Sequence, residues 1–96
     1  MELTSKQRAK LRAMAQKEEP ILHIGKGAMS ENIIRQAEEA LEARELIKGT
    51  VQQNSELTAK QACAALCEAT GAQPVSVMGR KFVMYRASKD KQKIEI

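Results

Sequence analysis

The chain is poor in aromatic residues and in the side chains from which most catalytic sites are built. Its 96 residues include one Phe, one Tyr and no Trp. A platform of aromatic rings on which RNA bases stack, as in RRM domains, is therefore a poor candidate. His23 is the only histidine, so no Ser-His-Asp or Cys-His set is available to activate a nucleophile. We predict that the protein is not an enzyme, and the alternative of a small hydrolase fails for lack of a nucleophile–base pair.

Metal ligands and membrane segments are equally scarce. Cys63 and Cys67 lie four residues apart, no Cys-x-x-Cys motif exists, and a zinc site is therefore not expected. A disulfide within one helical turn has poor geometry, which favours a reducing compartment. No segment approaches membrane-spanning length, and the N-terminus has no apolar signal-peptide core. We expect a cytoplasmic, monomeric protein without metal, cofactor, membrane contact or small-molecule substrate.

Hydrophobic periodicity predicts seven elements in one domain spanning residues 1–96. In chain order they are a helix from Thr4 or Ser5 that ends at 18–20, a strand at 21–24, a helix at about 31–45 capped by Ser30, a strand at 46–51, a helix from Thr58 to Gly71, and strands at 75–78 and 81–86. This α-β-α-β-α-β-β order indicates an α/β fold with a two-layer arrangement. The tail from about residue 88 is polar, and we expect it to be flexible.

The connections between these elements predict a four-stranded mixed sheet. The first two strands are joined through a helix and should be parallel, with a right-handed crossover. Gly79-Arg80 is typical of a type II′ hairpin, so the last two strands should be antiparallel. In that register Val75 and Val77 would share a face with Phe82 and Met84. The second and third helices should stack on the sheet, whereas the position of the first helix stays open.

The faces of the helices can also be predicted. Leu11, Met14 and Ala15 should form the buried face of the first helix. On the second helix the apolar stripe consists of Ile33, Ile34, Ala37, Ala40 and Leu41, and the outer, acidic face consists of Glu38, Glu39, Glu42 and Glu45. His23 lies within a predicted buried strand, so we expect it to be half-buried and hydrogen-bonded.

A glycine-rich turn joins the first strand to the second helix. It comprises Gly25, Lys26, Gly27 and Ala28. Free N–H groups at a helix N-terminus attract anions, glycine lets a phosphate backbone approach, and lysine adds a positive charge. Taken alone, such a turn is more often purely structural, and the nearby Glu31 would repel a phosphate.

The signs of charge are segregated along the chain, whose net charge is +4. The first helix carries Lys6, Arg8, Lys10, Arg12 and Lys17 with no acid before Glu18, and the strands and hairpin carry Lys48, Arg80, Lys81 and Arg86. Such a distribution indicates a positive surface that binds RNA by phosphate contacts. The alternative is a protein–protein adaptor that uses the acidic second helix.

Three segments together resemble the CRM-domain (CRS1–YhbY, or YhbY-like) RNA-binding family. They are "LTSKQRAKLRAMA", "ILHIGKGAMSENIIRQAEEALEARELIKGTV" and "TGAQPVSVMGRKFVMYRASKDK". The resemblance covers nearly the whole chain and implies a fold similar to the C-terminal domain of bacterial translation initiation factor 3. It also implies association with ribosomal RNA in large-subunit precursors during ribosome assembly. Related domains in plant organelles serve intron splicing.

The resemblance further implies an RNA-binding Gly-x-x-Gly loop flanked by basic surface. That loop corresponds to Gly25, Lys26, Gly27 and Ala28, with Ala28 where the family has its second glycine. If that position has positive φ, an alanine costs roughly 1 kcal/mol. Flanking RNA contacts are expected from Lys6, Arg8, Lys10, Arg12, Arg80, Lys81 and Arg86. A second departure is Gly49, where the strand would more usually carry an apolar residue.

Overall fold

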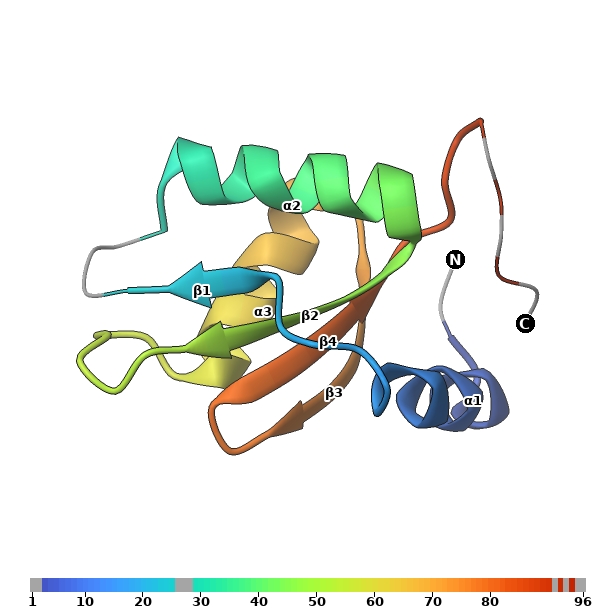
Figure 1. Cartoon of the computed structure of the whole chain (residues 1–96), viewed down its shortest axis with the longest axis horizontal. Coiled ribbons are helices and arrows are strands. Elements are labelled where there is room, and N and C mark those ends of the chain that lie inside the picture. The colour runs from blue at the N-terminus through green and yellow to red at the C-terminus, as the bar shows by residue number, and fades with distance from the viewer. Residues whose placement is uncertain (1–2, 26–28, 91, 93, 95–96) are drawn as a thin grey trace.

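In the computed structural model, the described residues form three helices and a four-stranded sheet, with helices on both faces of the sheet (Figure 1). The structure describes residues 3–25, 29–90, 92 and 94. The elements are α1 (Ser5–Ala15), β1 (Leu22–Ile24), α2 (Glu31–Arg44), β2 (Leu46–Val51), α3 (Ala59–Thr70), β3 (Gln73–Met78) and β4 (Lys81–Tyr85). The strand order is β1-β2-β4-β3. The α/β class and the four-stranded mixed sheet are confirmed. No helix within the described ranges is long and apolar enough to cross a membrane.

Short-range hydrogen bonds start the helices where the sequence predicts. Thr4 accepts a hydrogen bond from the backbone N–H of Gln7, and the Gln7 side chain accepts one from the Thr4 N–H. Thr58 and Gln61 form the same reciprocal capping box at α3. Ser30 caps α2. These bonds satisfy N–H groups that have no partner within the helix, so each helix begins at its cap.

The pairing of the strands follows the predicted connections. β1 and β2 are parallel, as expected for strands joined through α2, and β2–β4 and β3–β4 are antiparallel. Met78 pairs with Lys81 across a two-residue loop. Gly79 has φ 61°, and Glu45 is the only described non-glycine residue with positive φ, so Arg80 has negative φ. This combination is that of the predicted type II′ turn.

Because β3 contains a β-bulge, the predicted orientation of Val75 is wrong. The register between β3 and β4 shifts between Pro74 and Ser76, which leaves Val75 without a partner in the ladder. The extra residue reverses the side on which Val75 lies. Val75 therefore packs with Val83 rather than on the face that carries Phe82 and Met84.

Two hydrophobic clusters occupy the two faces of the sheet. The larger contains Phe82 and Met84 and packs beneath α2 and α3. The smaller contains Val83 and Tyr85 with Leu11 of α1, because alternate residues of β4 point to opposite faces. The position of α1, which the sequence left open, is therefore the face opposite α2 and α3 (Figure 1). The prediction that Met14 is buried there is wrong, since 37% of its surface is exposed.

Two predictions about polar residues are also wrong. His23 is exposed because it points to the face opposite the buried side chains of Leu22 and Ile24. Glu45, expected on the acidic face of α2, is completely buried. It ends α2 with φ 67°, which turns its side chain away from that face.

The buried carboxylate of Glu45 holds the segment that follows β4. Its two oxygens accept hydrogen bonds from the backbone N–H groups of Ser88 and Ile94, each at 2.8 Å. Ser88 is itself buried, and Ile94 packs against the cluster beneath α1. These described attachments argue against a tail that is free from about residue 88 onward.

Candidate nucleic-acid interface

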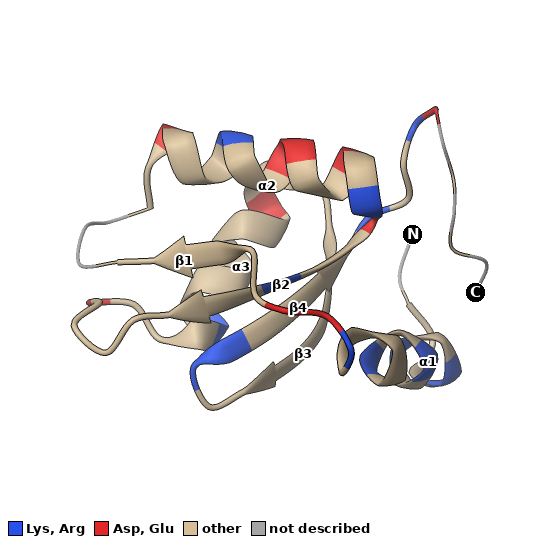
Figure 2. Cartoon of the chain, in the orientation of Figure 1, with Lys and Arg blue, Asp and Glu red and all other residues tan. Residues whose placement is uncertain are grey.

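The basic residues predicted on α1 lie on a helix that carries no acid (Figure 2). They are Lys6, Arg8, Lys10 and Arg12. Arg8 reaches β3, where its Nε donates a hydrogen bond to the Pro74 carbonyl oxygen at 3.4 Å. Lys6 and Arg12 are exposed and form no ion pair with any described carboxylate. Their charge is therefore available to a ligand.

Three further predicted contacts, Gly25, Arg80 and Lys81, lie at the end of the sheet where β1 and β2 finish. The Gln52 N–H donates to the Ile24 carbonyl at 2.8 Å, and the Val51 N–H donates to the Arg80 carbonyl at 2.7 Å. These bonds bring the residue after β1, Gly25, to the same end as the β3–β4 turn. A Cβ at Gly25 would lie 3.3 Å from the Gln52 side-chain oxygen. Gly25, with which the glycine-rich turn begins, therefore has little room for a larger side chain.

The remaining residues of that turn, Lys26, Gly27 and Ala28, fall outside the described residues. Their predicted role in holding phosphate stays a prediction. The last described residue before them, Gly25, directly follows β1. The end of β1 and helix α1 lie toward opposite ends of the molecule (Figure 1), whose longest extent is 36 Å. A single ligand that contacts both must therefore run along the molecule.

Arg86 has a different environment from the other predicted contacts. Its Nη1 donates to Glu38 Oε2 at 2.8 Å and to the Thr70 carbonyl at 2.8 Å. Its Nη2 lies 3.6 Å from Glu42 Oε2, and only 15% of the side chain is exposed. The guanidinium thus links the end of β4 to α2 and α3. We therefore leave Arg86 out of the proposed RNA-binding surface.

The acidic face of α2 is smaller than the sequence predicts. Glu38 is paired with Arg86, and Glu42 accepts hydrogen bonds from the Ser88 hydroxyl at 3.0 Å and the Lys89 N–H at 3.1 Å. The Ser88 hydrogen bond, aided by the backbone N–H of Lys89 and by Arg86, lowers the pKa of Glu42. With Glu45 buried, Glu39 is the one fully exposed carboxylate of the predicted set. Glu38 and Glu42 thus already have partners within the chain, which leaves the adaptor alternative with fewer unpaired carboxylates.

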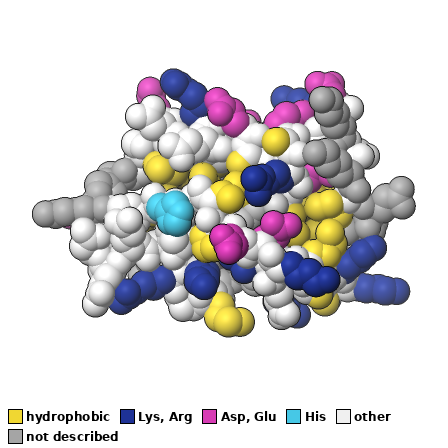
Figure 3. Space-filling model, in the orientation of Figure 1, with side chains coloured by type: hydrophobic (Ala, Val, Ile, Leu, Met, Phe, Trp, Pro, Cys, Tyr) yellow, Lys and Arg dark blue, Asp and Glu magenta, His cyan; other side chains and the backbone are white. Residues whose placement is uncertain are grey.

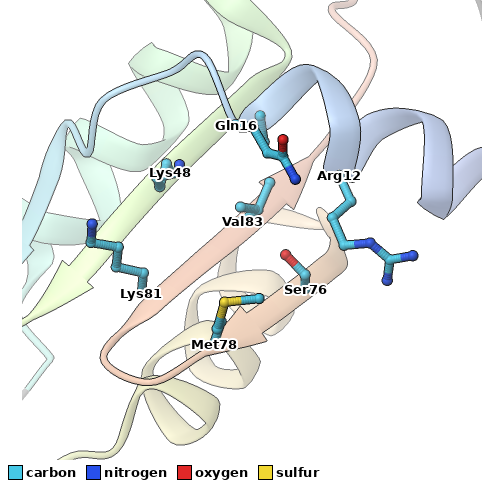
Figure 4. Close-up of a pocket in the computed structure, with 8 residues that line it drawn as sticks. Arg12, Gln16, Lys48, Ser76, Met78, Lys81 and Val83 are labelled. Atoms are coloured by element: carbon cyan, nitrogen blue, oxygen red, sulfur yellow. The ribbon is translucent and has the colours of Figure 1, made fainter.

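A third group of cations lies on the sheet itself. Lys48 of β2 and Lys81 of β4 lie on the face that α1 covers only in part, and they line a hollow of about 300 Å³ together with Arg12 (Figure 4). Side chains alternate between the two faces of a strand, so the sequence of residues 46–51 already places Lys48 on the other face from Ile47 and Val51. The sequence does not reveal the hollow, because its wall is formed by α1, whose position only the fold determines.

The charges on this side of the molecule follow the same division in part (Figure 3). Dark-blue side chains gather along the border formed by α1 and the β3–β4 hairpin, and others lie among the magenta side chains along α2. Glu18 and Glu19 also lie on this side, on the connection from α1 to β1 (Figure 2). Three other exposed acids among the described residues lie outside α2, namely Glu56, Glu68 and Asp90, so the two signs of charge are separated only in part.

Comparison with known proteins gives consistent matches along the chain. The model of the CRS1 / YhbY (CRM) domain matches residues 3–86. The chain is 43% identical over 94 residues to the Probable RNA-binding protein YqeI of Bacillus subtilis, covering 98% of each chain. It is 30% identical over 88 residues to a Haemophilus influenzae protein named RNA-binding protein, covering 92% of this chain and 89% of the relative.

A solved structure matches the fold as well. The solution structure of hypothetical protein SAV1595 from Staphylococcus aureus, described as a candidate RNA-binding protein, superimposes with a TM-score of 0.81. The two chains are 45% identical, and 98% of each is covered. The arrangement of helices and strands described above is therefore shared with a relative of known structure.

Proposed function

Because the chain belongs to the CRS1 / YhbY (CRM) domain family, we propose that it is an RNA-binding protein that contacts RNA mainly through phosphates. The relatives named as RNA-binding proteins support this proposal. The observation that carries it is the unequal pairing of charge. Carboxylates on α2 are held by Arg86, whereas Lys6, Arg12, Arg80 and Lys81 form no ion pair with a described residue.

The proposed contacts come from the glycine-rich turn, α1 and the hairpin. They are Gly25, Lys26, Gly27, Ala28, Lys6, Arg8, Lys10, Arg12, Arg80 and Lys81. We further propose, from the family resemblance, that the RNA is ribosomal RNA in large-subunit precursors and that the protein acts as a monomer in the cytoplasm. The absence of catalytic machinery in the sequence fits a binding role in assembly.

Sedimentation of a cell extract tests the ribosomal part of this proposal. We expect the protein to migrate with precursors of the large subunit at low salt. Because phosphate contacts release counterions, it should dissociate when the salt concentration is raised. Sedimentation only with free protein at low salt would contradict the ribosomal assignment. Release by a ribonuclease would distinguish attachment to RNA from attachment to protein.

Replacement of Lys26 tests the glycine-rich turn. Each phosphate contact to single-stranded RNA contributes roughly 0.7 to the slope of log affinity against log salt. K26Q should lower the slope by about that amount and weaken binding similarly for all RNA sequences. R44Q is a matched control, because Arg44 is exposed at the last position of α2, and the turn precedes the start of that helix. Equal slopes for K26Q and the wild type would remove Lys26 from the site.

A further inference from the structure

The face of the sheet that carries α1 remains open near the β3–β4 hairpin. In the β2–β4 register Lys48 pairs with Val83, and Thr50 pairs with Lys81. Lys48 and Lys81 are therefore diagonal neighbours on one face, at the spacing of about 7–8 Å usual for such pairs. Figure 4 shows these two lysines on one side of Val83 and Arg12 on the other. Three cations thus surround a hollow whose floor is the sheet.

Structural roles that usually explain lysine on a strand do not apply to this pair. Charged residues often protect an exposed sheet edge, but β2 and β4 are the two central strands. Like charges on neighbouring strands repel, and no described carboxylate forms an ion pair with Lys48, Lys81 or Arg12. The positive charges of these side chains therefore repel one another in the folded protein, and a bound anion would reduce this repulsion.

The floor of the hollow has a different character from its rim. Val83 lies in the centre, and Ser76 and Met78 of β3 form one side (Figure 4). Met78 is 77% exposed, an unusual position for a large apolar side chain. A thioether makes favourable contacts with aromatic rings, including those of a nucleobase. An apolar floor within a cationic rim matches a nucleotide whose base and phosphate are both accessible.

We propose that this hollow, the sheet-face groove, holds a short stretch of single-stranded RNA. Phosphates lie against Lys48, Lys81 and Arg12, and an unstacked base lies against Met78. Bases in a duplex are paired and stacked, and a single strand can splay them out. The inference rests on the proposed function and extends it, because it adds Lys48 and Met78 to the proposed contacts Arg12 and Lys81 and specifies the form of RNA.

The connection after α1 limits how the strand can lie. Gln16 lines the groove, and Glu18 and Glu19 follow it along this connection. Their carboxylates repel phosphate, so the RNA backbone should pass on the side of Lys81 and Met78. The groove also lies on the face of the sheet, whereas Gly25, with which the glycine-rich turn begins, lies at its end. The two sites can therefore be tested separately.

Fluorescence anisotropy with two labelled RNAs tests the groove. One is a single-stranded oligonucleotide, and the other is the same sequence annealed to its complement. K48Q/K81Q is compared with K60Q/K89Q, which removes the same charge from α3 and from the segment after β4. We expect K48Q/K81Q to weaken single-strand binding roughly tenfold. The salt slope should fall by about 1.4, from two phosphate contacts at 0.7 each.

Two further variants separate charge and apolar contact from folding. K48R/K81R keeps both charges and should bind single-stranded RNA as the wild type does. M78A should weaken binding of the single strand and leave binding of the duplex unchanged. Circular dichroism of each variant establishes that the fold is retained.

The outcomes distinguish the groove from the proposed function. If the wild type binds RNA and K48Q/K81Q and K60Q/K89Q weaken binding equally, the proposed role of the groove is wrong and the proposed function stands. Equal losses for single strand and duplex in K48Q/K81Q and M78A would overturn the single-strand assignment. A wild type that binds neither RNA would overturn the proposed function and the groove with it.

Discussion

Gly49 on β2 lies directly opposite Phe82 on β4, and the ring of Phe82 fills the space that a side chain at position 49 would need. A Cβ at Gly49 would lie 2.8 Å from each of the ring carbons Cε1 and Cε2 and closer still to Cζ. Phe82 is almost completely buried beneath α2 and α3. The glycine that departs from the expected strand pattern is therefore required by the single phenylalanine of the core.

This contact predicts a specific coupling between the two residues. G49A should lower the free energy of unfolding by about 1–3 kcal/mol, because the added methyl group forces the buried ring to move. F82L supplies a smaller side chain, so G49A should cost about 1 kcal/mol less in that background. Urea denaturation of the four proteins in the cycle measures this difference. The same penalty in both backgrounds would show that the ring is not the obstacle.

The C-terminal end of α2 allows backbone strain to be separated from hydrogen bonding. Glu45 has φ 67°, and its carboxylate holds the N–H groups of Ser88 and Ile94. E45A and E45G both remove the carboxylate, but only glycine adopts positive φ without a steric penalty. We expect E45A to be less stable than E45G by about 1 kcal/mol in thermal or chemical unfolding. Equal stabilities would show that the backbone at this position carries little strain.

The pKa of Glu42 predicts how stability depends on pH. Its ordinary value is 4.5, and the hydrogen bond from Ser88 lowers it in the folded protein. The unfolded chain therefore binds the proton more readily. The stabilisation by Glu42 is complete above pH 4.5 and is lost as the pH falls toward and through the lowered value.

Substitution of Glu42 should remove this part of the acid sensitivity. E42Q cannot ionise, so its unfolding free energy should fall less steeply than that of the wild type below pH 4.5. Chemical denaturation across the acid range measures the two slopes. E39Q is the matched control, because Glu39 is exposed on the same helix and forms no ion pair with a described residue. Identical slopes for E42Q and the wild type would contradict the assignment.

Arg86 should affect folding more than RNA binding. R86M removes the hydrogen bonds to Glu38 and to the Thr70 carbonyl, which should destabilise the protein by about 1–3 kcal/mol. RNA affinity, measured where the variant is folded, should change much less than in K48Q/K81Q. If R86M lost as much affinity as K48Q/K81Q while its stability was unchanged, Arg86 would belong to the RNA-binding surface.

Most of the local structure is predictable because residues close in sequence produce it. Thr4 and Thr58 begin helices through bonds to residues three positions away, and Gly79-Arg80 forms its turn from two residues. The face of Val75 could not be predicted in the same way. Its bulge depends on how β3 and β4 pair, and one extra residue reverses the alternation.

The candidate site was only partly predictable from the sequence. The basic composition of α1 and the glycine-rich turn are evident from the residues. The sequence does not distinguish Arg86 from Lys81. Arg86 pairs with Glu38, 48 residues away, whereas Lys81 forms no ion pair with a described residue. Both are cations near the last strand, and only long-range contacts give them different roles.

The sequence by itself determined the order of helices and strands, the caps, the hairpin and the family, because these follow from periodicity, local hydrogen bonds and recognisable motifs. The tertiary structure decided where α1 lies, which acids are neutralised and which cations remain exposed. Those outcomes depend on residues more than 40 positions apart, such as Glu45 and Ser88, whose approach no local pattern encodes. Placing α1 across the open face of the sheet leaves Lys48 and Lys81 beside a hollow, and this arrangement exists only in the folded chain.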